Sequence, residues 1–152
     1  MRKILFLTGI IVLMMSSCSK DDDGNTSDWD VDTRPEWTAV TEGVAPQGMY
    51  IIMDSEGLPV VNGKIVNVTS ADIMGAFVND ECRGVAVPYS EIDGKTHFYL
   101  KVKSTDTDAN NAMVELRYYS GEKKHIFCSE QFSFVADDNA GTLEEGFKPT
   151  WK

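Results

Sequence analysis

The sequence contains little positive charge and few residues with reactive side chains. Fourteen Lys and Arg stand against 24 Asp and Glu, which gives a formal net charge of -10, and the chain has only two His and three Cys. Such an acidic protein is repelled by phosphate backbones and by anionic membrane surfaces. The charge balance therefore argues against nucleic-acid binding and against peripheral adhesion to a membrane.

Helical periodicity is also scarce. No stretch repeats apolar residues at the helical spacing of about 3.6 residues for more than two turns, whereas strict alternation recurs. The clearest strands are Thr96 to Lys103 and Met113 to Tyr119, in which every second residue is apolar. This alternation places His97 and Tyr99 on the polar face of the first strand.

Further short strands are expected at regular intervals along the chain, separated by turn residues. They are Trp37 to Thr41, Gly48 to Met53, Lys64 to Val68, Ile73 to Val78, Cys82 to Val87, His125 to Cys128 and Gln131 to Val135, and the turns include Ser55-Glu56-Gly57, Asn62-Gly63, Asp93-Gly94 and Ser120-Gly121-Glu122. About eight or nine such strands predict an all-β fold, an antiparallel β-sandwich of the immunoglobulin-like or jelly-roll-like kind, in preference to a barrel.

The N-terminus has the features of an export signal. Arg2 and Lys3 precede an apolar run from Ile4 to Met15, which is too short for a membrane-spanning helix but suits the apolar region of a signal peptide. Met15-Ser16-Ser17-Cys18 resembles the bacterial lipoprotein box, although that box more often has Gly or Ala before its Cys. We therefore expect residues 1–17 to be removed and Cys18 to carry the lipid attachment.

Acidic residues follow the expected lipidation site. Ser19-Lys20-Asp21-Asp22-Asp23 resembles the tag of Bacteroidetes-type lipoproteins that are sent to the outer face of the outer membrane. The resemblance implies an outer membrane lipoprotein exposed at the cell surface. Each buried acyl methylene contributes about 0.8 kcal/mol, so several chains on one Cys hold a protein to the membrane permanently.

Three regions are therefore expected along the chain. Residues 1–17 form the signal peptide, residues 18–35 form the lipidated Cys and a flexible acidic tether, and residues 36–152 form one domain. The tether is rich in Ser, Asp, Asn, Gly and Thr and has almost nothing to bury. Trp29 is its exception and is interpreted as a partly docked linker residue.

The run from Ile73 to Val87 predicts a central hairpin, and two registers are open. A two-residue turn at Asn79-Asp80 pairs Phe77 with Cys82. A three-residue turn shifts the pairing and places Phe77 across from Arg83, close enough for a cation–π contact. In both registers small residues predict the close approach of another backbone, and they are Gly75, Ala76, Gly84 and Ala86.

The hairpin also carries a resemblance to a known family. Ala76 to Ala86, with the run Glu81-Cys82-Arg83-Gly84, is similar to the motif of an uncharacterised all-β module of Bacteroidetes secreted proteins and lipoproteins. Further pieces that resemble the module are Phe98 to Val102, Tyr118-Tyr119, Phe132-Ser133-Phe134, Gly141-Thr142 and Pro149-Thr150-Trp151. The resemblance implies fold and location, and it implies no activity.

Two cysteines remain beyond the lipidation site. In an exported protein Cys82 and Cys128 are candidates for a disulfide. Two separate buried thiols are the alternative, and the sequence leaves both open.

No pattern in the chain indicates catalysis, a metal site or a cofactor. His97 and His125 have no nucleophile with an orienting acid beside them and no zinc-ligand spacing. Asp106 to Asn111 begins like a calcium loop, but the sixth position is Asn111 instead of Gly and the twelfth is Arg117 instead of Glu. We therefore expect a protein that is not an enzyme.

Aromatic side chains are the best candidates for ligand binding, because flat rings on loops and outward faces stack on sugars or anchor protein partners. The candidates are Trp37, Tyr89, Tyr99, Tyr119 and Trp151. The alternative for Trp37 and Trp151 is that they close the ends of the core. The expected function is a surface-tethered, non-catalytic module that binds an extracellular glycan or a protein partner, and the second hypothesis is a structural or accessory subunit of an outer-membrane or surface assembly.

Overall fold

The computed structural model describes residues 29–89, 91–105 and 112–152, and these form an all-β domain. Cys18 and the expected signal peptide, residues 1–17, lie outside the described residues, as does the calcium-loop-like stretch 106–111. The one helical element within the described ranges is the 3₁₀ turn η1 (Ser55–Gly57). In this part of the chain no helix has the length and apolar character needed to span a membrane.

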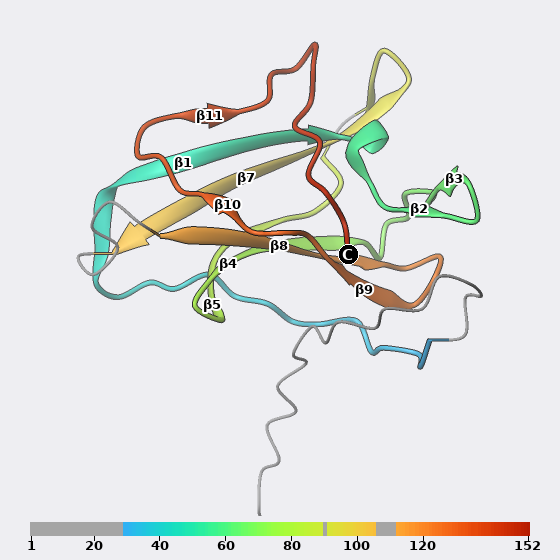
Figure 1. The fold of residues 1–152 in the computed structure, drawn as a ribbon, viewed down its shortest axis with the longest axis horizontal. Helices are drawn as coiled ribbons and strands as arrows, with labels where there is room; N and C mark the ends of the chain where they lie inside the picture. Colours follow the sequence, from blue (N-terminus) through green and yellow to red (C-terminus); the bar gives the residue numbers. More distant parts are fainter. Residues whose placement is uncertain (1–28, 90, 106–111) are drawn as a thin grey trace, which may run out of the picture.

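The strands form two main sheets (Figure 1). The first sheet has the order β11-β1-β7-β6; in the second, the order is β10-β8-β4-β5, and β9 also pairs with β8. The strands are β1 (Val44–Asp54), β2 (Val60–Val61), β3 (Lys64–Ile65), β4 (Ile73–Val78), β5 (Glu81–Ala86), β6 (Glu91–Ile92), β7 (Lys95–Thr105), β8 (Met113–Ser120), β9 (His125–Cys128), β10 (Phe132–Ser133) and β11 (Asn139–Ala140).

The expected sandwich is confirmed, since the two sheets share one core and do not close into a barrel. Alternate residues of β1, β4, β7 and β8 face inward, and each is at most 5% exposed: Met49, Ile51, Met53, Met74, Ala76, Val78, Phe98, Leu100, Val102, Val114, Leu116 and Tyr118. The Phe98 and Tyr118 rings meet edge to face across the sheets, with centroids 5.9 Å apart. Burial of each large aliphatic side chain contributes about 1.5–3 kcal/mol, so this layer dominates the stability.

Several expected strands are shorter than their patterns suggested. Lys64 to Val68 contributes two residues to the small β2–β3 hairpin, whose turn at Asn62-Gly63 has the positive φ angles of a type I′ turn, 52° and 75°. Gln131 to Val135 contributes only β10. Conversely, β11 forms outside the expected strands, because its backbone pairs in parallel with the edge of β1.

The largest difference between the predicted and the observed structure is in residues 29–41, which we call the N-terminal segment. Trp37 to Thr41 was expected to be a strand, but the whole segment is irregular and crosses the outer face of the second sheet (Figure 1). Trp29 Nε1 donates to the Lys123 carbonyl (3.4 Å), and Arg34 Nε donates to the Ala71 carbonyl (2.7 Å). The Val40 amide donates to the Cys82 carbonyl (2.9 Å) on β5. The chain is therefore already in contact with the domain at Trp29, seven residues before the expected boundary at 36.

The outer face of the second sheet explains why this segment docks. Its strand β4 is buried on both faces, so its outward apolar side chains need a cover. Trp37 supplies part of it, with its ring edge-on to Phe77 at a centroid distance of 5.4 Å. A Cβ on Gly75 would lie only 3.0 Å from the Trp37 ring, so the small residue makes room for it.

The central hairpin joins β4 and β5 through a two-residue turn. Phe77 pairs with Cys82, as the two-residue register predicts, and Asn79 and Asp80 have φ angles of 49° and 62°. These left-handed conformations define a type I′ turn, whose twist matches that of the strands. Beyond this pair the register shifts, and Arg83 becomes the extra residue of a β-bulge.

The predicted close approach of another backbone occurs at Gly84. A Cβ at this position would lie 2.5 Å from the Lys101 carbonyl oxygen on β7. Strand β5 therefore packs directly against the backbone of the first sheet, which holds the two sheets together at this edge.

Candidate functional site

The five candidate aromatics divide into structural and exposed groups. Tyr119 is only 6% exposed, so the expectation that it faces solvent is wrong; it lies on the outer face that the N-terminal segment crosses. Trp37 is half-buried over Phe77. Trp151 is half-buried against the core, and its Nε1 donates to the Gly57 carbonyl at 2.8 Å. The alternative hypothesis, closure of the core, matches the contacts of Trp151. Trp37 instead covers outward side chains of β4.

Tyr89 and Tyr99 remain exposed, at 76% and 45%. Tyr89 lies in the connection before β6, where its amide donates to the His97 carbonyl. Tyr99 is on β7, and its side chain points away from the core between the inward Phe98 and Leu100. Of these two exposed tyrosines, Tyr99 is therefore the one on the outer face of a sheet.

A second tyrosine, Tyr50 on β1, lies on the same outer face. Tyr50 pairs with Lys101 and Ile52 pairs with Tyr99, so the two tyrosines are diagonal neighbours. Diagonal positions in an antiparallel pair are about 7–8 Å apart, within reach of one extended ligand. Tyr50 is 39% exposed and Ile52, between the rings, is 9% exposed.

Polar groups flank the Tyr50 ring on both sides. Asn139 of β11 pairs with Tyr50 from one side, and Lys101 of β7 pairs with it from the other. The Lys101 ammonium lies 5.8 Å from the ring centroid. We call this surface the tyrosine face, defined by Tyr50, Ile52, Tyr99, Lys101 and Asn139.

Sequence reasoning identified Tyr99 but missed Tyr50 and Asn139. Tyr50 sits in the apolar run Gly48 to Met53, where its neighbours Met49 and Ile51 are both buried. The alternation that selected Tyr99 applies here as well and could have found Tyr50. Asn139 could not have been found, because its position depends on a parallel pairing between segments far apart in the chain.

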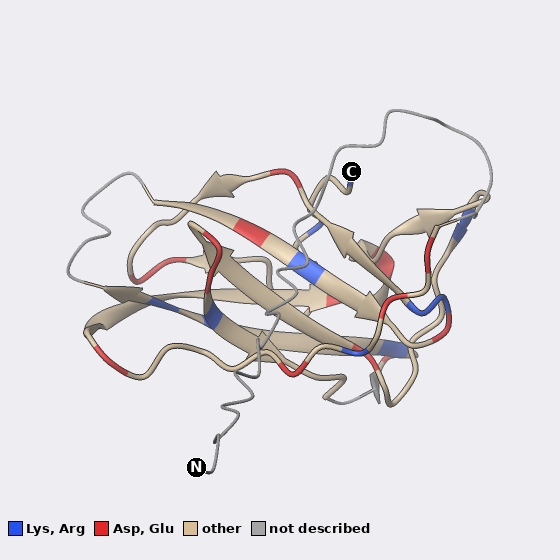
Figure 2. Cartoon of the chain, turned by 90° about the horizontal axis from the view of Figure 1, so that it is seen from below, with Lys and Arg blue, Asp and Glu red and all other residues tan. Residues whose placement is uncertain are grey.

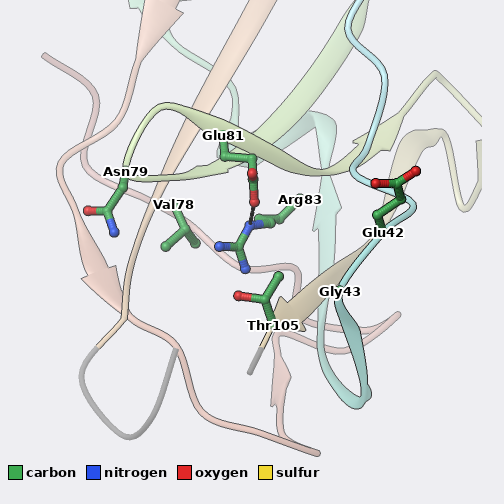
Figure 3. A pocket seen from close by; sticks show the side chains of 7 residues that line it. All are labelled: Glu42, Gly43, Val78, Asn79, Glu81, Arg83 and Thr105. Carbon is green, nitrogen blue, oxygen red and sulfur yellow. Dashed lines mark hydrogen bonds and ion pairs between the residues drawn. The ribbon is translucent and has the colours of Figure 1, made fainter. Parts of the chain in front are cut away.

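A hollow of about 490 Å³ lies at the turn of the central hairpin (Figure 3). It is lined by Glu42, Gly43, Val78, Asn79, Glu81, Arg83 and Thr105. The Arg83 guanidinium is almost fully buried; its Nε donates to Glu81 (2.6 Å) and its Nη1 donates to the Lys103 carbonyl (3.3 Å). Since Glu81 already neutralises this cation, the hollow offers a ligand little uncompensated charge.

Phe77 has a cation–π partner, although the three-residue register that would have placed Arg83 opposite it does not form. Arg117 of β8, not Arg83, lies over the Phe77 ring at 4.2 Å from its centroid. Arg117 also donates from Nε to Glu115 at 2.9 Å and from Nη2 to Asp80. Burial lowers the Arg117 pKa, but the Asp80 and Glu115 carboxylates together outweigh it and raise the pKa above its ordinary value.

The candidate bridge between Cys82 and Cys128 does not form. Cys82 carries a free thiol, and burial raises its pKa. Cys82 is on β5 and Cys128 is on β9, and β4 and β8 lie between them. Three strand spacings amount to about 14 Å, whereas a disulfide needs Cα atoms within about 7 Å.

The two histidines are both packed into the domain. His97 is 1% exposed, which corrects its expected place on a polar surface: its Nε2 lies 3.3 Å from the carbonyl of Leu143, whose segment covers it. His125 stacks on Trp29 at a centroid distance of 4.5 Å. Across the described ranges, no group of three or more His, Cys, Asp or Glu is placed to hold a metal ion.

Charge is unevenly distributed between strands and connections. In Figure 2 most acidic residues lie on turns and connecting segments. The outward positions of the paired stretches 48–52 on β1 and 99–103 on β7 contain no acid and include Lys101 and Lys103. The tyrosine face is therefore free of carboxylates on its two central strands.

No protein-family model matches the chain, and no curated protein or solved structure matches it either. Function must therefore be inferred from the chemistry of this surface.

Proposed function

We propose that this protein is a lipoprotein of the outer membrane, exposed at the cell surface, whose domain binds an extracellular glycan without catalysis. Residues 1–17 would be the signal peptide and Cys18 the lipidated residue. The similarity of the Ala76 to Ala86 run to the Bacteroidetes module supports this location. The observation that carries the binding function is the pair of exposed rings, Tyr50 and Tyr99, on one flat sheet face.

Tyrosine rings suit sugars because a sugar ring presents apolar C–H groups on its face and hydroxyls at its rim. The ring of Tyr50 can cover the apolar face, and the amide of Asn139 can donate to and accept from the hydroxyls. Tyr99, as the diagonal neighbour, can receive the adjoining sugar of a chain. The arrangement therefore fits an oligosaccharide lying across β1 and β7.

The direction of the tether supports the same proposal. Trp29, the first described residue, docks against the β8–β9 hairpin of the second sheet. The N-terminal segment runs beneath the second sheet, whereas β1 and β7 lie on the other side of the molecule (Figure 1). A tether that connects the domain to the membrane at Trp29 would therefore orient the tyrosine face away from the membrane.

Glycan binding is tested with a glycan array and the full-length, processed protein in mild detergent. Tyr50→Ala and Tyr99→Ala should each weaken binding about fivefold or more, since a stacked ring contributes about 1 kcal/mol or more. Tyr89→Ala is the matched control, because this exposed tyrosine lies off the face. Equal binding by all three variants, or no glycan bound at all, would contradict the proposed function.

Lipidation is tested separately. Metabolic labelling with a radioactive fatty acid should mark the wild-type chain and not Cys18→Ser, and protease added to intact cells should remove the domain. An unlabelled protein whose Cys18 is free or disulfide-linked would refute the anchor. A labelled but protease-resistant protein would place it on the periplasmic side.

A second candidate function, a subunit of a surface assembly, is favoured by the edge segment before β7. Val87, Tyr89 and Ile92 are 52%, 76% and 40% exposed there. Exposed apolar residues at a short edge strand can pair with a neighbouring chain. Sedimentation of wild type and Tyr89→Ser over a wide concentration range tests it: association that the variant abolishes supports the assembly, and a wild-type monomer throughout excludes self-assembly.

A further inference from the structure

We infer that the tyrosine face selects an acidic saccharide, a sugar carrying a carboxylate or sulfate group, over a neutral one. This inference rests on the proposed glycan-binding function and specifies its ligand class. It depends on Lys101, and on what surrounds that side chain.

Lys101 is exposed and has no carboxylate partner among the described residues. The other two lysines at outward positions of β7 differ from it. Lys95 pairs with Glu56 (3.1 Å) and Asp54 (3.7 Å), and the Lys103 ammonium donates to the Val40 carbonyl (2.9 Å). Lys101 thus keeps its charge available on the face, in a chain whose net charge is -10.

Asp137 and Asp138 precede Asn139, and neither forms an ion pair with Lys101 at the described positions. The Asp138 Oδ1 accepts the Asn139 amide at 2.9 Å. Asp138 lies beyond Tyr50 from Lys101, since its carbonyl accepts the Tyr50 amide at 3.0 Å. The backbones of Asp138 and Lys101 therefore lie on opposite sides of β1.

The row formed by Asn139, Tyr50 and Lys101 spans three neighbouring strands. Adjacent strands are about 4.8 Å apart, so the backbones of Asn139 and Lys101 are separated by about 10 Å. Tyr50 lies between them on β1. A sugar stacked on Tyr50 can direct its hydroxyls to Asn139 and an acidic substituent to Lys101. The charge-assisted hydrogen bond to the ammonium is stronger than one between neutral groups.

The buried Arg83 is a weaker candidate for the same anion. Its guanidinium already bonds Glu81 and the Lys103 carbonyl, and it lies in the hollow at the hairpin turn. An anion placed there would lie beside the Glu81 carboxylate, which would repel it. Lys101 is therefore the cation that the geometry assigns to the ligand.

The experiment compares each glycan bound on the array with its carboxyl-reduced or desulfated counterpart, using the processed full-length protein. Wild type should bind the acidic form at least tenfold more tightly, and rising salt should weaken that binding. Lys101→Gln should remove most of the difference, and Lys101→Arg should retain it. Lys64→Gln is the control, because it changes the net charge equally at an exposed position on β3, away from the face.

The outcomes separate this inference from the proposed function. If acidic and neutral forms bind equally, or Lys101→Gln behaves like Lys64→Gln, acid selection is refuted, while the loss on Tyr50→Ala still supports glycan binding. If only neutral glycans bind, the inference fails in the same way. If no glycan binds and the tyrosine variants change nothing, both the acid selection and the proposed glycan binding are refuted.

Discussion

The Arg117 guanidinium lies over the Phe77 ring, 4.2 Å from its centroid, on the outer face of the second sheet. The same arginine bonds Glu115 of its own strand and Asp80 of the hairpin turn. One side chain thus links β8 to both the β4 strand and the turn that follows it, under the cover of the N-terminal segment.

Arg117→Met should lower the free energy of unfolding by about 1–3 kcal/mol, because a half-buried carboxylate at Glu115 loses a partner and the cation–π contact is lost. Urea denaturation measures this change. Arg34→Met, which removes a single exposed bond to the Ala71 carbonyl, is the comparison and should cost under about 1 kcal/mol. Equal stabilities for the two variants would show that Arg117 is not a structural link.

Tyr118 and Asp72 form a buried pair that predicts behaviour at high pH. Asp72 is fully buried and accepts bonds from the Tyr118 hydroxyl, the Thr69 hydroxyl (2.6 Å) and the Gly121 amide (2.8 Å). Burial, followed by the Asp72 carboxylate, raises the Tyr118 pKa well above its ordinary value of 10.0. In the unfolded chain the phenol ionises near pH 10, so stability falls as pH rises through 10.

Spectrophotometric titration checks this pair. The Tyr118 phenol should ionise only when the domain unfolds, and Tyr118→Phe should lower stability at pH 7 by about 1–2 kcal/mol while reducing its loss above pH 10. Asp72→Ala should cost more, because the Thr69 amide donates to Asp72 as well (3.2 Å) and the substitution leaves four donors without this acceptor. Smooth ionisation of every tyrosine in the folded state would contradict the expected protection.

His125 makes docking of the N-terminal segment sensitive to pH. It stacks on Trp29, and its Nδ1 lies 2.9 Å from Asp32 Oδ2, which also accepts the Ile126 amide. Burial lowers the His125 pKa below 6.5 and outweighs the Asp32 carboxylate, which raises it. Because the unfolded chain then binds the proton more readily, this contribution to stability is present above pH 6.5 and is lost as pH falls below it.

Thermal melting between pH 7.5 and 5.5 measures the effect. The wild-type melting temperature should fall over this range, and His125→Phe, which keeps a flat ring against Trp29 without a titrating group, should show a smaller fall. The same slope in both proteins would mean that another group is responsible.

Gly84→Ala should be strongly destabilising, by about 1–3 kcal/mol or more, because the new methyl would meet the Lys101 carbonyl oxygen at 2.5 Å and would force β5 away from β7. Gly63→Ala is the control, since nothing lies within 4 Å of a Cβ there and only its positive φ is penalised, at about 1 kcal/mol. Chemical denaturation of both variants gives the comparison. A milder effect at Gly84 than at Gly63 would contradict the close contact.

Local patterns alone were sufficient for the inward faces of the long strands and for the tight turns. Alternation along Thr96 to Lys103 and Met113 to Tyr119 predicted the inward faces of β7 and β8, because side chains of a strand point to opposite sides with a period of two. The type I′ turns at Asn62-Gly63 and Asp93-Gly94 followed from residues that accept positive φ. These properties depend on neighbours in the chain and need no knowledge of the fold.

Tertiary structure decided which of these strand faces are exposed to solvent. Tyr119 and Tyr99 alternate in the same way and both point away from the core, yet the first is 6% exposed and the second is 45% exposed. Likewise the order of the strands, which places β4 and β8 between Cys82 and Cys128, excludes their bridge. Burial depends on which distant segment covers a face, and pairing sets which residues become neighbours across strands, so Asn139, Tyr50 and Lys101 form a row only in the folded domain.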